Sequence, residues 1–236
     1  MDVNKNAAEM AGISEDGKKI YRWKTVLKVL ATVLALILIL ALLLYGAADI
    51  ALHSKSFPIT LVGDDGEGGL RISLSEDAAG TVLSTHLKAP VIDEMGDMSS
   101  LYLPADVDSG EGSHNGTDYI AYTFYLRNPT DKVGKVEERM DLLAATKGAD
   151  EAVRIRIFRD GVPATYAAPA KDGGPEYGTT PFADNKTIYT DTADIAAGQV
   201  VRYTIVIWLE GDDPECVDSV RGGKIRVSVN FAVKDE

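Results

Sequence analysis

The sequence has one cysteine, Cys216, in 236 residues, so no disulfide can form within the chain. Its 22 glycines are too few for a collagen-like repeat. Basic residues are also few: 24 Lys and Arg against 36 Asp and Glu give a net charge of −12, which opposes binding to nucleic acid phosphates. These shortages exclude a disulfide scaffold and a collagen-like fibre, and they predict that nucleic acid is not a partner.

A long hydrophobic run lies near the start of the chain. The 20 residues from Val26 to Tyr45 are interrupted by a single charge, that of Lys28. A helix of that length spans roughly 30 Å, the hydrocarbon thickness of a bilayer. Lys28 falls in the first turn, from which its ammonium group can reach the lipid headgroups. The run therefore predicts a transmembrane helix over residues 25–46, with the lipid bilayer as its partner.

The flanking charges predict the orientation of this helix. The run is followed by Asp49, His53 and Lys55, whereas five basic residues lie before or at its start: Lys18, Lys19, Arg22, Lys24 and Lys28. Because the basic side of a single span stays in the cytoplasm, the N-terminus is expected inside and the rest outside the cell. A cleaved signal peptide is the alternative, with Gly46-Ala47-Ala48 as its cleavage site.

This placement divides the chain into four parts. We expect a polar cytoplasmic tail over residues 1–24, the helix over 25–46, a tether over 47–56 and an extracellular domain over 57–236. Residues 1–48 hold six of the 24 basic and four of the 36 acidic residues, which leaves 18 basic and 32 acidic residues and a net charge of −14 for the remainder. An acidic, disulfide-free exported domain is typical of a bacterial surface.

Alternation of apolar and polar residues dominates the predicted extracellular domain and indicates strands. Residues 118–128 carry apolar side chains on both faces, which predicts a central strand covered on both sides. Residues 153–158 alternate, with Val153 inward and Arg154 outward. The strands predicted by these patterns span residues 57–62, 70–74, 118–128, 153–158, 200–209 and 224–233.

The segments between these strands are less regular. Residues 135–145 fit a helix or a strand, residues 146–152 predict a turn or a short helix, and residues 169–186 read as a long loop. Asp160-Gly161 is typical of a tight hairpin turn. About eight strands with little helix predict an all-β fold, an antiparallel two-sheet sandwich of jelly-roll or immunoglobulin-like topology.

The residues that most often carry catalysis are sparse. The histidines His53, His86 and His114 lack metal-ligand spacing, and no nucleophile or phosphate-loop motif is present. The acidic residues beside Cys216 would raise the pKa of its thiol, which opposes a nucleophilic role. We therefore expect that the protein is not an enzyme.

Acidic loops suggest a calcium site, because Ca²⁺ prefers carboxylate oxygens from flexible turns. Two loops, at residues 64–67 and 106–111, are weaker candidates, and Glu111 holds the position where an EF-hand loop needs glycine. The best loop lies between the two last strands. It holds four carboxylates, which form the predicted metal site: Asp212, Asp213, Glu215 and Asp218.

Three segments resemble a group of uncharacterised anchored surface proteins of Gram-positive bacteria: Tyr122–Asn128, Ala152–Gly161 and Ile207–Cys216. The most specific part is Trp-Leu-Glu-Gly-Asp-Asp-Pro-Glu-Cys at residues 208–216. More distantly, the order of an export segment and a sandwich is similar to the TasA/camelysin group of biofilm-fibre proteins. That resemblance implies a jelly-roll domain that polymerises by strand exchange after signal cleavage. The hydrophobic segment departs from that group because it has the features of a permanent anchor.

These observations favour a non-enzymatic surface module that binds an unidentified protein partner or associates with itself. The first alternative is a carbohydrate- or calcium-binding domain, in which tyrosines such as Tyr166, Tyr177 and Tyr189 could stack on sugars. The second is a cleaved subunit of a TasA-like fibre, with residues 57–62 as the donated strand.

Overall fold

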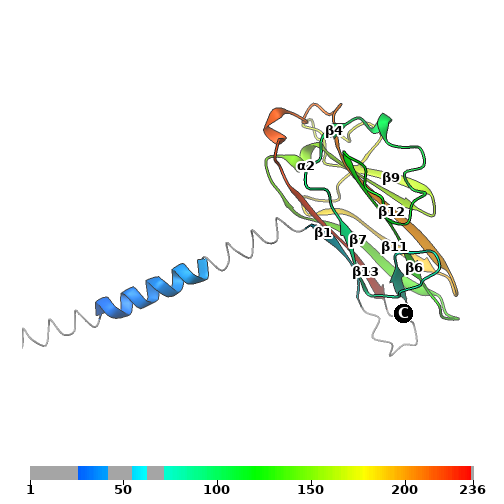
Figure 1. The fold of residues 1–236 in the computed structure, drawn as a ribbon, viewed down its shortest axis with the longest axis horizontal. Helices are drawn as coiled ribbons and strands as arrows, with labels where there is room; N and C mark the ends of the chain where they lie inside the picture. The colour runs from blue at the N-terminus through cyan, green and yellow to red at the C-terminus, as the bar shows by residue number, and fades with distance from the viewer. Residues whose placement is uncertain (1–25, 42–54, 63–71, 235–236) are drawn as a thin grey trace, which may run out of the picture. The chain divides into compact units, whose positions relative to one another are not determined.

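The computed structural model describes residues 26–41, 55–62 and 72–234. The chain divides into two units, residues 1–53 and Ser54–Glu236. Residues 26–41 of the first unit form a helix, and the second unit is the β domain (Figure 1). The predicted tail over residues 1–24, most of the tether and the acidic loop at residues 64–67 lie outside the described residues.

Apart from Lys28 and Thr32 in its first two turns, the helix over residues 26–41 is apolar on all sides. Its large side chains are all exposed, with exposed fractions from 48% at Val33 to 68% at Leu34. Thr32 donates its hydroxyl to the carbonyl of Lys28 one turn earlier, at 2.8 Å. Within the described part of the chain, no helix is both long and apolar enough to cross a membrane. The predicted span over residues 25–46 extends past this helix into residues that the structure does not describe.

The described part of the β domain contains thirteen strands in two sheets. The five-stranded sheet has the order β11 (Thr187–Ile195), β7 (Gly134–Ala145), β13 (Ile225–Lys234), β1 (Ser56–Val62) and β3 (His86–Pro90). The eight-stranded sheet has the order β10 (Thr180–Pro181), β9 (Val162–Ala167), β8 (Val153–Arg159), β12 (Val200–Glu210), β6 (Tyr119–Arg127) and β2 (Ser73–Ser75). Two further short strands join it, β4 (Asp97–Met98) beside β12 and β5 (Gly112–Ser113) beside β6.

One hydrophobic core lies between the two sheets, which confirms the predicted all-β, two-sheet architecture. Phe231 of β13 contacts Phe124 of β6 and Tyr203 of β12 edge to face, with ring centroids 5.8 and 5.3 Å apart. Phe124 and Tyr203 in turn stack on each other across neighbouring strands. Aromatic rings from both sheets thus fill the centre of the domain and fix how the sheets pack.

The eight-stranded sheet is also covered on its outer face, which explains why β6 and β12 are apolar on both sides. Ala121, Val206 and Trp208 point outward and pack against Val107. The prediction of a covered central strand at residues 118–128 is therefore confirmed. The covering segment, residues 98–107, contributes Met98, Leu103 and Val107 to this contact and contains one 3-10 turn, η1 (Ser100–Tyr102).

The strand directions differ from the expectation of a purely antiparallel sandwich. Three pairs are parallel: β1 with β13, β9 with β10 and β4 with β12. The number of strands also exceeds the expected eight, because β3, β11 and the shortest strands were not predicted, and β9 was implied only by its hairpin turn. Residues 135–145, which fit either a helix or a strand, belong to β7, whose inward residues Val136 and Met140 are fully buried.

The connections follow the turn chemistry of the sequence. Asp160 and Gly161 have positive φ angles of 49° and 79° and join β8 to β9 as a two-residue hairpin, as predicted. The predicted turn or short helix at residues 146–152 contains α2 (Ala149–Ala152). A second 3-10 turn, η2 (Asp218–Val220), precedes β13. The long loop at residues 169–186 carries the two residues of β10.

Candidate functional site

The loop that follows β12 distributes its carboxylates between two places. Asp213 is directed into the domain, and its side chain is completely buried. Asp212, its neighbour, is exposed and lines a groove on the surface. Two backbone hydrogen bonds fix the conformation of this loop. The N–H of Asp213 donates to the carbonyl of Glu210 at 3.2 Å, and the N–H of Cys216 donates to the carbonyl of Asp213 at 3.0 Å.

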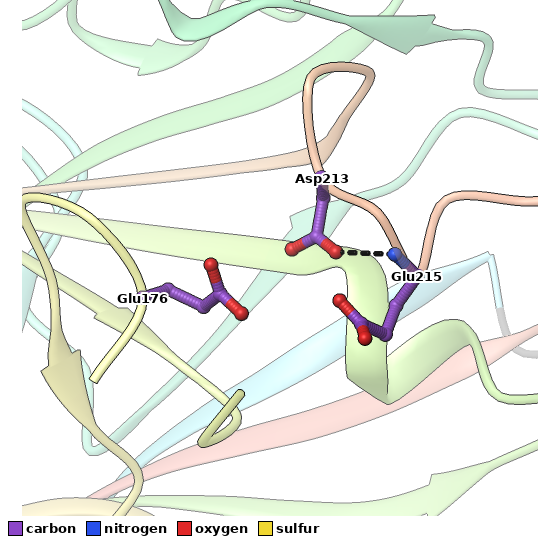
Figure 2. Close-up of side chains that lie close together, drawn as sticks. All are labelled: Glu176, Asp213 and Glu215. Atoms are coloured by element: carbon purple, nitrogen blue, oxygen red, sulfur yellow. Dashed lines mark hydrogen bonds between the residues drawn. The ribbon is translucent and has the colours of Figure 1, made fainter. Parts of the chain in front are cut away.

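Glu176, Asp213 and Glu215 form the first site, which we call the acidic cluster (Figure 2). One carboxylate oxygen from each lies within 4.8 Å of the other two. Asp213 and Glu215 belong to the loop after β12, whereas Glu176 comes from the long loop that follows β9. Asp213 also accepts the N–H of Glu215 at 2.7 Å, which orients its carboxylate.

The acidic cluster already contains cationic side chains. Arg154 of β8 is hydrogen-bonded and ion-paired through Nη2 to Asp213, and the same nitrogen lies 3.5 Å from Glu176. Lys171 pairs with Glu215 at 3.2 Å. The sequence pattern predicts that Arg154 points outward from its sheet. On that outer face the side chain is nevertheless buried, with 5% exposed, because Glu176 and Asp213 reach it from the loops after β9 and β12.

These surroundings shift two pKa values. Burial raises the pKa of Glu176 above its ordinary value, Asp213 raises it further, and Arg154 opposes both. Burial also raises the pKa of the Cys216 thiol, and Asp97, Asp213 and Glu210 add to that effect. A raised thiol pKa keeps Cys216 protonated, which is the direction expected from its acidic neighbours.

The four residues of the predicted metal site are dispersed. Asp213 and Glu215 meet in the acidic cluster, Asp212 lines the groove, and Asp218 is exposed and paired with Arg221 at 3.2 Å. The sequence reasoning missed Glu176 and Arg154, because both come from distant segments. Three converging carboxylates have the chemistry that Ca²⁺ requires, but the guanidinium of Arg154 already balances two of them. Calcium binding here stays a prediction.

The second site is a groove with a volume of about 590 Å³, which is lined in part by the two residues of β4. β4 itself lies at one end of the β domain (Figure 1). Three segments line the groove: residues 97–102, 117–119 and 211–212. Its lining residues are Asp97, Met98, Ser99, Tyr102, Thr117, Asp118, Tyr119, Gly211 and Asp212. The groove therefore offers three carboxylates, two phenol rings and two hydroxyls, without a basic residue.

The remaining sequence candidates lie elsewhere. Both ring nitrogens of His114 contact backbone carbonyls, those of Gly112 and Val107, at 3.0 and 2.9 Å. Tyr166 and Tyr189 stack on each other with centroids 5.3 Å apart. Tyr189 is buried, so the expectation that it is exposed for sugar binding is wrong, whereas Tyr166 is half-buried. Tyr177 is fully exposed, as expected. The groove tyrosines, Tyr102 and Tyr119, were not singled out.

Comparisons with known proteins add little to this geometry. No protein-family model matches the chain, and no curated protein sequence matches it. Among solved structures, the chain is similar to a β-glucosidase from Kluyveromyces marxianus crystallised in complex with glucose, with 10% sequence identity and a TM-score of 0.25. The match covers 71% of this chain and 16% of the length of the β-glucosidase chain.

Proposed function

We propose that the protein is a non-enzymatic surface module, anchored in the cell membrane by residues 25–46 and presenting its β domain outside the cell for binding to a partner protein. The observation that carries this proposal is the helix over residues 26–41. Its apolar side chains are exposed on all sides, and the uncharged sequence continues to Tyr45. An apolar surface of this kind needs a lipid or protein environment, because water does not solvate it favourably.

Two features support binding in preference to catalysis. The groove lies at the surface and is lined by exposed residues such as Asp97 and Asp212, whereas catalytic groups usually converge in a water-excluded site. Neither His86, His114 nor Cys216 is among the residues that line it. The long covering segment and the loops after β9 and β12 gather at one end of the sandwich, which is where such folds present binding surfaces. The finer topology, jelly-roll or immunoglobulin-like, stays a prediction.

The anchor is tested by fractionating bacterial cells that express the full-length protein and by adding protease to intact cells. We expect the protein in the membrane fraction and the β domain digested from outside. In an Ile37→Arg/Leu40→Arg variant, each arginine opposes insertion by about 2.5–3.5 kcal/mol, so the protein should shift to the soluble fraction. An Ile37→Val/Leu40→Ile variant is the matched control and should stay in the membrane.

Two results would contradict the anchor. One is wild-type protein in the soluble fraction, and the other is a β domain that external protease does not reach in intact cells. Mass spectrometry of the mature N-terminus separates the two export routes, because a protein that begins at Met1 retains its anchor and one that begins at Asp49 has been cleaved.

A second candidate function is assembly by strand exchange, which the position of β1 favours. β1 is the first strand of the domain, and it lies between β13 and β3 in the five-stranded sheet. Phe57, Ile59 and Leu61 insert from it into the core and are almost fully buried. A β1 strand from a second copy would make the same hydrogen bonds and fill the same space, which is the physical basis of strand exchange.

Engineered disulfides distinguish exchange from self-pairing. Thr60 and Asn230 are direct partners across the β1–β13 ladder, close enough for a disulfide. A Thr60→Cys/Asn230→Cys variant in a Cys216→Ser background should form a ladder of linked chains if strands exchange. A linked monomer at all concentrations would contradict exchange. The Thr60→Cys single variant controls for random cross-linking.

A further inference from the structure

The groove has an acidic lining that nothing in the described chain neutralises. Asp97, Asp118 and Asp212 contribute three carboxylates, and none of them forms an ion pair with a described residue. Like charges that share a concave surface raise the local negative potential and attract cations. The groove thus offers a favourable place for a positively charged group.

The backbone is arranged to keep two of these carboxylates in position and accessible. Gly96 donates its N–H to Asp118 at 3.0 Å, and a Cβ atom at Gly96 would lie 2.6 Å from the same oxygen. A Cβ atom at Gly211 would lie 3.1 Å from an oxygen of Asp97. Glycine at both positions therefore leaves room for the carboxylates where a larger residue would displace them.

Tyr102 is held at the rim of the groove by a buried acid. Glu210, with 8% of its surface exposed, accepts the N–H of Ser100 at 3.2 Å and the indole N–H of Trp208 at 3.1 Å. Ser99 caps the same turn through the N–H of Leu101. This anchoring fixes η1, whose Tyr102 side chain is 79% exposed, as an aromatic surface beside the carboxylates.

The spacing of the carboxylates indicates what kind of cation fits. Among the described residues, only the acidic cluster brings three ligand atoms within 4.8 Å of one another. The three groove carboxylates do not meet this limit as a set, so they are not arranged as the ligands of a single metal ion. The guanidinium group of arginine or the ammonium group of lysine is larger than a metal ion and can bond to carboxylates at separate positions. Contact with an aromatic face stabilises such a cation further.

We propose that this groove binds an arginine- or lysine-bearing segment of a partner protein, which rests on the binding function proposed above. Tyr102 and Tyr119 contact the cationic side chain, and Asp97, Asp118 and Asp212 balance its charge. Leu101, which is 86% exposed next to Tyr102, offers an apolar contact for the neighbouring residues of the segment. Arginine and tyrosine are common energetic centres of protein interfaces, in agreement with this pairing.

The test uses full-length protein in detergent micelles and the peptide Gly-Arg-Gly-Arg-Gly-amide carrying a neutral fluorescent dye on its N-terminus, with binding followed by anisotropy. The comparison peptide carries citrulline, a neutral analogue of arginine, at both positions. We expect the arginine peptide to bind saturably and to bind more weakly as salt is added. The citrulline peptide should bind at least fivefold more weakly, because it lacks the two charge pairs that the arginines form.

Matched variants locate the site. Asp97→Asn/Asp212→Asn should weaken binding roughly fivefold to tenfold, and Tyr102→Ala roughly threefold to fivefold. Asp131→Asn/Asp194→Asn makes the same change in net charge at exposed positions outside the groove lining and should leave the affinity unchanged. Melting temperatures close to that of the wild type verify that each variant is folded.

Several outcomes would overturn the proposal. The arginine peptide fails to bind, the citrulline peptide binds equally well, or the Asp131→Asn/Asp194→Asn control weakens binding as much as the groove variant does. Binding of a neutral oligosaccharide that the groove variants abolish, without binding of the arginine peptide, would assign the groove to sugars. Membrane fractionation of the same variants tests the anchor independently of peptide binding. A result that contradicts the groove proposal can therefore be distinguished from one that contradicts the proposed anchored module.

Discussion

The two acidic sites of this protein begin at adjacent residues, and their opposite environments show how burial determines what a carboxylate does. Asp213 is completely buried and ion-paired with Arg154. Asp212 is exposed in the groove without an ion-pair partner among the described residues. A buried carboxylate must have its charge balanced within the protein, whereas an exposed one is solvated and stays available to a ligand. The acidic cluster is therefore expected to be structural, and the groove to be a place for binding.

The largest effect is expected from breaking the buried ion pair. An Arg154→Met variant leaves Asp213 and Glu176 without their shared cation, and we expect the free energy of unfolding to fall by about 3–5 kcal/mol. Urea unfolding of the full-length protein in detergent, followed by tryptophan fluorescence, measures this change. Adding Asp213→Asn to Arg154→Met should recover part of the loss, because the buried charge is removed. A loss below about 1 kcal/mol for Arg154→Met would mean that the ion pair is not structural.

Calcium binding tests whether the ion pair of Arg154 keeps cations out of the acidic cluster. In the wild type, Arg154 competes with Ca²⁺ for the acidic cluster, so the melting temperature should be the same with Ca²⁺ and with a chelator. In Arg154→Met the three carboxylates lack that competitor. A Ca²⁺ concentration about a hundred times its dissociation constant would therefore raise the free energy of unfolding of this variant by about 2.7 kcal/mol.

A Glu176→Gln substitution in the Arg154→Met background is the matched control for calcium, because it removes one of the three ligands. It should reduce the stabilisation by Ca²⁺. If the wild type is itself stabilised by Ca²⁺, the view that Arg154 excludes the ion is wrong, and the metal site predicted from the sequence gains support through Asp213 and Glu215.

The acidic cluster should also respond to pH. Burial and Asp213 raise the pKa of Glu176, so its protonated form is favoured in the folded state. The resulting stabilisation is present below the ordinary pKa of 4.5 and is lost as the pH rises through the higher folded value. We expect Glu176→Gln to lose less stability than the wild type when the pH is raised from about 4 to 7.

Unfolding experiments at a series of pH values measure the pH effect. The difference should grow in the Arg154→Met background, where the opposing effect of Arg154 on the Glu176 carboxyl is gone. Parallel pH profiles of the wild type and Glu176→Gln would show that Glu176 is not perturbed in the folded protein.

The sequence predicts the strands whose local pattern is strong, and it fails where pairing alone makes a strand. Residues 224–233 alternate clearly, residues 118–128 and 200–209 are rich in β-branched and aromatic residues on both faces, and the three segments correspond to β13, β6 and β12. β9 contains Pro163, which lowers its strand propensity but is tolerated next to the sheet edge, and β11 is interrupted by Asp191 and Asp194. Parallel pairing of β1 with β13 joins the two ends of the domain, and no local pattern reports such long-range contacts.

The sites could be predicted only in part for the same reason. The density of carboxylates at residues 212–218 singled out the loop after β12, and it brought Asp213 and Glu215 into consideration. Local spacing cannot indicate that Asp212 and Asp213 face different surroundings, because that depends on how the loop folds against β8. Glu176 and Arg154 reach the acidic cluster from distant segments, and the groove is assembled from three segments that the sequence keeps apart.

The smallest effect is expected from the groove, and it completes the contrast with Arg154. The Asp97→Asn/Asp212→Asn variant removes two exposed like charges that have no ion-pair partner in the described chain. We expect the free energy of unfolding to stay the same or to rise by no more than about 0.5 kcal/mol, since surface repulsion is weak and screened. Urea unfolding at low and high salt measures it, and any gain should shrink at high salt. A loss above about 1 kcal/mol would show that these carboxylates hold the fold together, and the distinction between a structural acidic cluster and a binding groove would then fail.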